Sequence, residues 1–211
     1  MRKVAQKPTV ADLEKGVAFE LIDEVEYASI HQWIQRYLFR IGWITGPFWL
    51  LNILAVVVII VQWRRADTPI LEAVPTVCVG MVFGVLALLP IHEHIHGLAY
   101  RMMGASNAQV RYELRRVTAY CVAPDQVFSS KEYAFVCLAP FAVLNPLLTV
   151  AALVAPAGPV ALLLAGALLM HTGACSGDFA IVEYLWSRRG DPVFTFDDSK
   201  RERACMYRGR R

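Results

Sequence analysis

The sequence lacks the features of several protein classes. Its five cysteines are odd in number and scattered without a Cys-x-x-Cys pair, which excludes a disulfide framework and an obvious cysteine metal cluster. Charged residues make up only 18% of the 211 positions and the formal net charge is +3, so nothing indicates nucleic-acid binding. There is no internal repeat. No apolar segment follows Arg2 and Lys3, and we therefore expect no cleavable signal peptide.

Apolar residues, by contrast, are abundant. They account for 56% of the chain, and the mean hydropathy of +0.43 is typical of a membrane protein rather than a soluble one. Four predominantly apolar runs are long enough to cross the hydrocarbon core of a bilayer. They cover residues 43–63, 75–100, 134–155 and 160–180. Trp43 and Trp63 flank the first run, as tryptophans do at membrane interfaces.

Two further elements are expected outside these runs. Between residues 27 and 41, apolar side chains recur at helical spacing opposite a basic, polar face. This pattern predicts an amphipathic helix that lies on the membrane surface or, alternatively, docks on a partner. Two strand-like segments, Gln109 to Leu114 and Val117 to Cys121, meet at Arg115-Arg116 and predict a small β-hairpin.

The basic residues predict the orientation of the chain. They lie before the first run, between the second and third, and after the fourth, whereas the link between the third and fourth has none. The positive-inside rule then places both termini and residues 101–133 in the cytoplasm. We expect an all-α protein of the cell membrane with four transmembrane helices, an N-terminal interfacial helix and a cytoplasmic hairpin. Its segments would be a cytoplasmic or interfacial part (1–42), a four-span domain (43–186) and a basic cytoplasmic tail (187–211).

The second apolar run contains the candidate catalytic residues, in a His-Glu-x-x-His pattern formed by His92, Glu93 and His96. Residues four apart share one face of a helix, so both imidazoles can reach the same Zn²⁺. Glu93 projects beside them and can act as general base toward a water on the metal. His94 points to the other side of the helix. Ionisable groups at membrane depth are expensive and usually functional.

A catalytic zinc usually has three protein ligands, so one more is needed. Asp178 is the best candidate, because it is the only acidic residue within 160–180 and an unpaired carboxylate there would be costly. His171 lies two helical turns, roughly 10 Å, deeper if the helix is straight. We therefore expect His171 to assist catalysis by positioning a substrate carbonyl rather than to bind the metal.

These residues resemble the site-2-protease group of intramembrane metalloproteases, and more closely the small families of putative zincin peptidases related to it. The similarity covers roughly residues 75–200 and rests on four short motifs: His92-Glu93-x-x-His96, Tyr120-Cys121-x-x-Pro124, Leu138-Ala139-Pro140 and Ser176-Gly177-Asp178. The resemblance implies zinc ligation by His92, His96 and Asp178, with Glu93 as the base. Asn145-Pro146 departs from the pattern, because site-2 proteases carry Asn-Pro on the same helix as the aspartate.

The sequence thus favours a zinc-dependent peptidase that hydrolyses membrane-protein or peptide substrates in or near the bilayer. One alternative is a non-hydrolytic haem protein, in which His92 or His96 pairs with His171 as axial ligands. That alternative leaves Glu93 and Asp178 unexplained. A second alternative is an inactive relative that binds membrane partners, against which the intact Glu93 argues.

The predicted orientation can be tested with reporter fusions after Arg65, Lys131, Gly158 and Arg211. Because the basic residues flank the proposed cytoplasmic ends, these fusions should report outside, inside, outside and inside. An outside signal at Arg211 would contradict the prediction.

Overall fold

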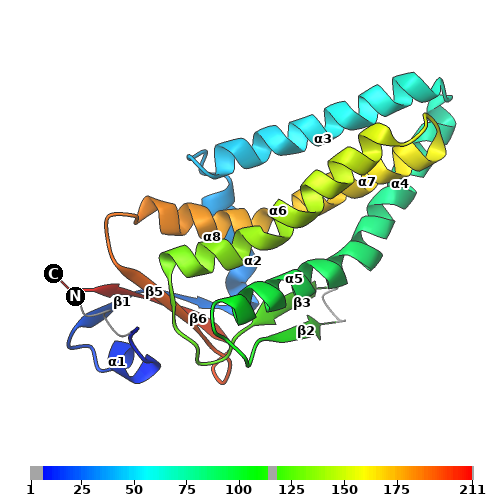
Figure 1. Cartoon of the computed structure of the whole chain (residues 1–211). Coiled ribbons are helices and arrows are strands. Elements are labelled where there is room, and N and C mark those ends of the chain that lie inside the picture. The colour runs from blue at the N-terminus through cyan, green and yellow to red at the C-terminus, as the bar shows by residue number, and fades with distance from the viewer. Residues whose placement is uncertain (1–6, 114–117, 211) are drawn as a thin grey trace, which may run out of the picture.

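The computed structural model describes residues 7–113 and 118–210 (Figure 1). Within those residues, four helical segments are long and apolar enough to cross a membrane, as expected. They are α3 (Thr45–Ala66); α4 (Ile70–Phe83) continued by the π-helical η2 (Gly84–Leu88) and α5 (Leu89–Met102); α6 (Ser130–Val154); and α7 (Pro159–Ala174) continued by α8 (Ser176–Ser187).

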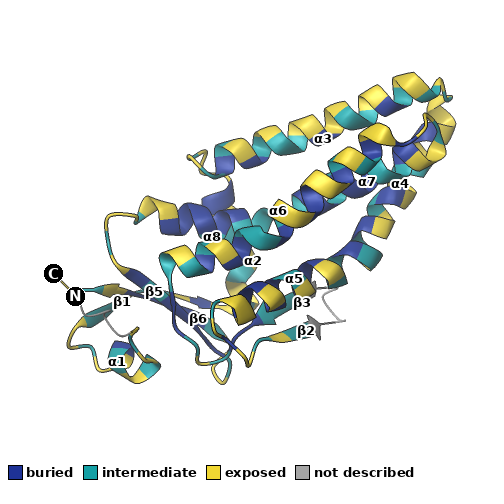
Figure 2. Cartoon of the chain, in the orientation of Figure 1, coloured by how far each residue is buried: buried dark blue, intermediate teal, exposed yellow. Residues whose placement is uncertain are grey.

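The outer faces of these helices are apolar and exposed (Figure 2). On α3 and α4 the exposed positions are mainly leucine, isoleucine and valine, a surface larger than water-soluble monomers normally present. The segment formed by α7 and α8 is the most buried of the four, with half of its apolar window inside the protein. The fold is therefore that of a multi-pass membrane protein arranged around α7.

The second span is interrupted shortly before Pro90. The interruption takes the form of the π-helical segment η2, directly before α5, and Pro90 sits in the first turn of α5. Proline has no N–H to donate to the preceding turn, and π-helical segments commonly mark bends. The ribbon turns between α4 and α5 (Figure 1). This change of direction sets the course of α5, which carries the His-Glu-x-x-His pattern.

The expectation of an all-α protein is wrong, because the structure also contains a four-stranded antiparallel sheet. Its strands are β1 (Phe19–Glu26), β4 (Phe128–Ser129), β5 (Val193–Asp198) and β6 (Arg203–Gly209), in the order β1-β6-β5-β4. The N-terminal part and the basic tail, which we treated as separate segments, pair directly through β1 and β6. The sheet lies at one end of the helical bundle (Figure 1).

The two faces of the sheet have different neighbours because side chains alternate along a strand. Phe194 and Phe196 of β5 face the short helix α1 (Val10–Glu14), where Leu13 is completely buried. Val193 of β5 and Met206 of β6 instead join the main core with the helices. One face of the sheet therefore closes the end of the helical bundle.

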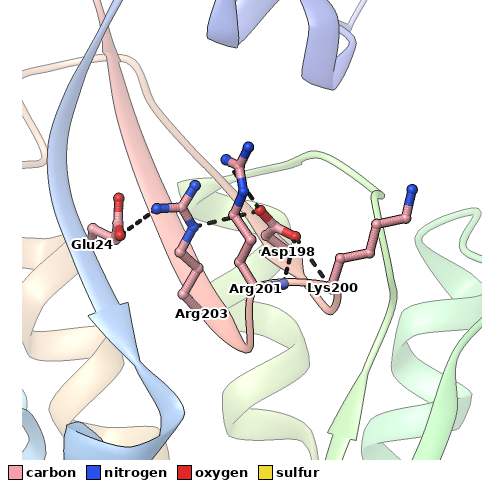
Figure 3. Close-up of polar contacts among 5 residues, drawn as sticks. All are labelled: Glu24, Asp198, Lys200, Arg201 and Arg203. Carbon is pink, nitrogen blue, oxygen red and sulfur yellow. Dashed lines mark hydrogen bonds and ion pairs between the residues drawn. The ribbon is translucent and has the colours of Figure 1, made fainter.

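Ion pairs hold β1 against β6 and fix the turn between β5 and β6 (Figure 3). Arg203 contacts both Glu24 of β1 and Asp198 of β5, and Asp198 also accepts hydrogen bonds from the backbone of Lys200 and Arg201. Exposed ion pairs contribute little individually. Here they join strands from opposite ends of the chain, and so they specify which strands pair.

The predicted hairpin is confirmed: β2 (Gln109–Glu113) pairs antiparallel with β3 (Thr118–Val122). Its expected connection, Arg115-Arg116, lies outside the described residues. The amphipathic segment forms the 3-10 turn η1 (Tyr27–Ser29) and helix α2 (Ile30–Leu38). Trp33 and Tyr37 of α2 pack their rings 5.2 Å from that of Tyr184 on α8. The apolar face of α2 thus packs on this chain's own α8, and the position of α2 at the membrane surface stays a prediction.

Helices α4 and α7 approach each other closely at glycines. A Cβ atom at Gly80 would overlap the carbonyl of Leu163, and one at Gly166 would overlap the carbonyl of Val77. Small residues allow such close helix contacts in membranes, where packing rather than hydrophobic burial drives association. This contact holds α4 on the central helix α7.

Substituting Gly166 by alanine should therefore push α4 away from α7 and lower the stability by about 1–3 kcal/mol, as overpacking usually does. Gly173→Ala is the matched control in the same helix, because its new Cβ would meet only Asn52 Oδ1, at 3.8 Å. Thermal unfolding of the purified variants in detergent measures the difference. Equal melting temperatures for the two variants would contradict this account of the contact.

Candidate metal centre

Helix α5 turns the His-Glu-x-x-His side chains into the protein. His92, Glu93 and His96 are all buried, with exposed fractions of 5%, 5% and 8%. His94 is exposed on the opposite side, and its Nδ1 lies 2.7 Å from the carbonyl oxygen of Pro90 in the same helix. The helical spacing therefore separates the buried side chains from His94 as the sequence predicted.

Three side chains of the types that bind metals converge from α5 and α8. His92 Nε2 and His96 Nε2 are 3.0 Å apart, and they lie 3.4 Å and 3.3 Å from the two carboxylate oxygens of Asp178. In a tetrahedral zinc site with bonds of about 2.0–2.1 Å, neighbouring ligand atoms are roughly 3.3 Å apart. The three side chains thus already have the spacing of three corners of such a site.

The other acid of α8, Glu183, is buried and has a different environment. Glu183 Oε2 accepts hydrogen bonds from the backbone N–H groups of Ile44 (2.9 Å) and Thr45 (3.2 Å), at the start of α3. These N–H groups have no partner within their own helix, so Glu183 serves as a cap. Asp178, in contrast, faces the two histidines, and this contrast singles it out as the candidate ligand.

A chain of hydrogen bonds fixes the tautomer of His92. The Thr172 hydroxyl donates to the carbonyl of Leu168, and so it accepts from the amide nitrogen of Asn145. The oxygen of Asn145 then faces His171 Nδ1 at 2.5 Å, so that nitrogen carries the hydrogen. His171 Nε2 is left as an acceptor for His92 Nδ1–H at 3.3 Å. The remaining nitrogen, His92 Nε2, presents its lone pair toward Asp178.

The tautomer of His96 follows from one contact. Its Nδ1 lies 2.9 Å from the carbonyl oxygen of Val136 on α6, which can only accept. His96 Nε2 therefore also presents a lone pair, 3.0 Å from that of His92. Two lone pairs and a carboxylate repel one another unless a positive charge lies between them. This arrangement of imidazole nitrogens and carboxylate oxygens fits zinc.

Next to His92, His96 and Asp178 lies a buried carboxylate oxygen that has no hydrogen-bond partner among the described residues. This atom is Glu93 Oε2, and burying an unsatisfied carboxylate oxygen is costly. Glu93 follows His92 directly in the sequence. Its Oε2 is free to accept a hydrogen bond from a water or a substrate that enters the site.

The structure places His171 differently from the sequence expectation. The span is not a straight helix, because α7 ends at Ala174 and α8 begins at Ser176, which changes the relative positions of His171 and Asp178. His171 therefore contacts His92 directly, and Asn145 and His92 occupy its two ring nitrogens. In this arrangement His171 has no N–H left for a substrate carbonyl, and it orients His92 instead.

The same contacts count against the haem alternative. Axial haem ligands lie on opposite sides of the porphyrin. His92 and His171 are in hydrogen-bond contact through their ring nitrogens, so no porphyrin fits between this pair.

The centre opens into a cavity of about 610 Å³ between α5, α8, β3 and the sheet. Cys121 of β3 lines it, and burial raises the pKa of the Cys121 thiol to about 12, with Glu93 and Asp197 adding to the effect. The thiol is therefore neutral at physiological pH and is not an activated nucleophile. Sequence reasoning did not single out Thr172, Tyr27 or Asp197, because each comes from a different element and belongs to no local motif.

Residues 85–191 match the model of a protein family, DUF3267, described as "Putative zincin peptidase". The chain belongs to this family. The matched region includes α5, Asn145, His171 and Asp178, that is, the whole convergent group, but ends before β5 and β6. Membership suggests a metallopeptidase and implies zinc, in agreement with the donor atoms. No curated protein and no solved structure gives a significant match.

Metal analysis of purified variants tests the ligand set. Asp178→Ala should lose zinc as completely as His96→Ala, because two ligands alone leave the ion under-coordinated. The exposed His94→Ala is the control and should retain zinc. Full zinc occupancy in Asp178→Ala would show that this aspartate is not a ligand.

In the same series, His171→Ala should retain zinc with an affinity about 10–100-fold lower, the usual effect of removing a partner that orients a ligand. Competition with a chelator measures this difference. Complete loss of zinc in His171→Ala alone would place His171, rather than Asp178, on the metal.

Proposed function

We propose that the protein is a zinc-dependent peptidase that hydrolyses peptide bonds of membrane-protein substrates within or next to the bilayer. The observation that carries the proposal is the convergence of His92 Nε2, His96 Nε2 and the Asp178 carboxylate beside Glu93, whose Oε2 has no hydrogen-bond partner among the described residues. The family assignment supports the peptidase chemistry. The four apolar helical segments support a membrane setting for the reaction.

His92, His96 and Asp178 would hold the zinc ion. When bound, zinc supplies Lewis acidity, which polarises a carbonyl and lowers the pKa of water. His171, Asn145 and Thr172 keep His92 in the tautomer that presents Nε2, while Val136 does the same for His96. The protein thus organises the imidazoles in advance, and no rotamer or tautomer has to change for binding.

Glu93 is the proposed general base. Its unpartnered oxygen can accept a proton from the attacking water as the oxygen–carbon bond forms, and then deliver that proton to the amine as the peptide carbon–nitrogen bond breaks. The proton is conserved, and Glu93 returns to its starting form. Burial beside the histidines holds the carboxylate in place and limits competition from bulk water.

A membrane-embedded substrate has to unwind before cleavage, because the carbonyl groups of a helix are already hydrogen-bonded. Tyr120, Cys121 and Val122 of β3 line the cavity. An unwound segment would add to this hairpin as a further strand, the backbone pairing that many proteins use to hold extended peptides.

We further propose that the protein resides in the cell membrane with both termini in the cytoplasm. The positive-inside rule supports this orientation. The sheet contains segments near both termini, so both lie at the end of the bundle where the cavity is found (Figure 1). In that orientation the cavity would open toward the cytoplasmic side.

The base is tested by Glu93→Gln, which keeps the size of the side chain but cannot accept a proton at neutral pH. We expect full zinc content and a loss of cleavage of a model membrane substrate of at least about 100-fold. Glu72→Gln, at an exposed position in the first turn of α4, is the control and should cleave at the wild-type rate.

Wild-type cleavage by Glu93→Gln would exclude Glu93 as the base. A wild-type protein that contains zinc but cleaves nothing would instead favour a non-catalytic, partner-binding role.

A further inference from the structure

The cavity contains a second buried carboxylate, which the proposed reaction does not use. Asp197 of β5 is only 5% exposed and lines the same cavity as Glu93. Alternation along β5 places it on the face of Val193, which is the face toward the helices. Asp197 therefore points to the interior between the sheet and the bundle, and not to the ion pairs around its neighbour Asp198.

The backbone around Asp197 is firmly placed. Its carbonyl oxygen accepts from the N–H of Asp125 at 3.2 Å, and Pro124 forms a bridge with it. The side chain accepts hydrogen bonds from the backbone N–H of Ala123 and from the Tyr27 hydroxyl, and Arg111 acts on it without forming an ion pair within the described residues. Burial raises the pKa of Asp197 to about 6. No cation among the described residues is thus in direct contact with this buried acid.

Aromatic side chains surround the carboxylate. Four tyrosines line the cavity with it: Tyr27, Tyr100, Tyr120 and Tyr133. The rings of Tyr27 and Tyr120 meet edge to face at 5.7 Å, and those of Tyr100 and Tyr133 are 6.5 Å apart. The Tyr27 hydroxyl is buried and acts on the Asp197 carboxylate as a hydrogen-bond donor, while its own oxygen accepts no hydrogen bond among the described residues. A carboxylate next to tyrosine rings and a hydroxyl oxygen that can still accept is an environment that suits an ammonium group.

Asp197 and the tyrosines around it lie in the same cavity as the metal centre but contribute no ligand to it. Cys121 lines the cavity with Glu93 and Asp197 and is close enough to both carboxylates for each of them to raise its pKa. Its Sγ also packs over Gly97, one residue after the ligand His96. A substrate with its scissile bond at Glu93 would therefore extend past Cys121 toward Asp197.

We infer that Asp197, together with Tyr27 and Tyr120, forms a specificity subsite that binds a protonated amine of the substrate. The amine would be either the amino terminus or a lysine side chain. Its three N–H donors match the carboxylate and the Tyr27 oxygen, and its charge compensates the buried acid. The inference rests on the proposed peptidase function and adds a preference for substrates with a positive charge at one side of the cleaved bond.

Three peptide hydroxamates with the same backbone separate these possibilities. The hydroxamate group binds zinc and anchors each probe at the metal centre. One probe carries a lysine side chain and an acetylated amino terminus, the second norleucine and a free amino terminus, and the third norleucine and an acetylated terminus. Dissociation constants are measured with the zinc-loaded wild-type protein and with Asp197→Asn, which keeps the shape of the side chain.

We expect one of the two cationic probes to bind the wild type about tenfold or more tightly than the neutral probe, the usual effect of a charged hydrogen bond in a buried site. In Asp197→Asn this preference should disappear, so that the ratio of the two dissociation constants is about 1, while the affinity of the neutral probe stays unchanged. The neutral probe thereby reports that the variant is folded. Glu202→Gln, at an exposed position on the cavity rim, removes the same charge and should keep most of the preference.

Equal binding of all three probes to the wild type would overturn the inference, as would a preference that survives in Asp197→Asn or disappears equally in Glu202→Gln. If no hydroxamate binds the zinc-loaded wild type, or if zinc itself does not bind, the proposed peptidase function fails instead. The tighter of the two cationic probes identifies the source of the amine.

Discussion

The contact between α5 and the α7–α8 segment is the interaction on which the structure depends. Two imidazole nitrogens with fixed lone pairs meet one carboxylate inside an apolar bundle, and each histidine is oriented from behind by a neutral hydrogen-bond acceptor. Such an arrangement is costly without a cation, so the remaining helices must hold it in place. The glycine contact between α4 and α7 and the bend before α5 both serve this end.

Helices and sheet contribute differently to the candidate site. The helices supply the proposed ligands, the proposed base and the groups that orient them, and these positions all fall within the region that matches the zincin peptidase family. The sheet closes the end of the bundle and contributes Asp197 to the cavity wall. Because β5 and β6 lie beyond the matched region, the proposed chemistry and the proposed substrate preference would come from different parts of the chain.

Much of this was accessible from the sequence. Four spans, the hairpin and the His-Glu-x-x-His face follow from hydrophobic runs and helical spacing, which are local properties. The contact of His171 with His92 was not predictable, because it depends on a helix break at Cys175. The sheet was missed because an acidic N-terminal segment pairs with a basic tail, and the two are almost the whole chain apart. Their alternating patterns and the complementary pairs Glu20–Arg208 and Glu24–Arg203 were its signal.

The order of strands has a consequence for biosynthesis. Strand β6 lies between β1 and β5, so β1 has no partner in this sheet until β6 has been made. Chains emerge N-terminus first, and the four apolar helical segments, which all precede β6, can insert and pack before that point. The cavity wall formed by the sheet is therefore completed only after the helices that carry the metal centre. The proposed peptidase would stay without its full substrate-binding surface until β6 has paired with β1.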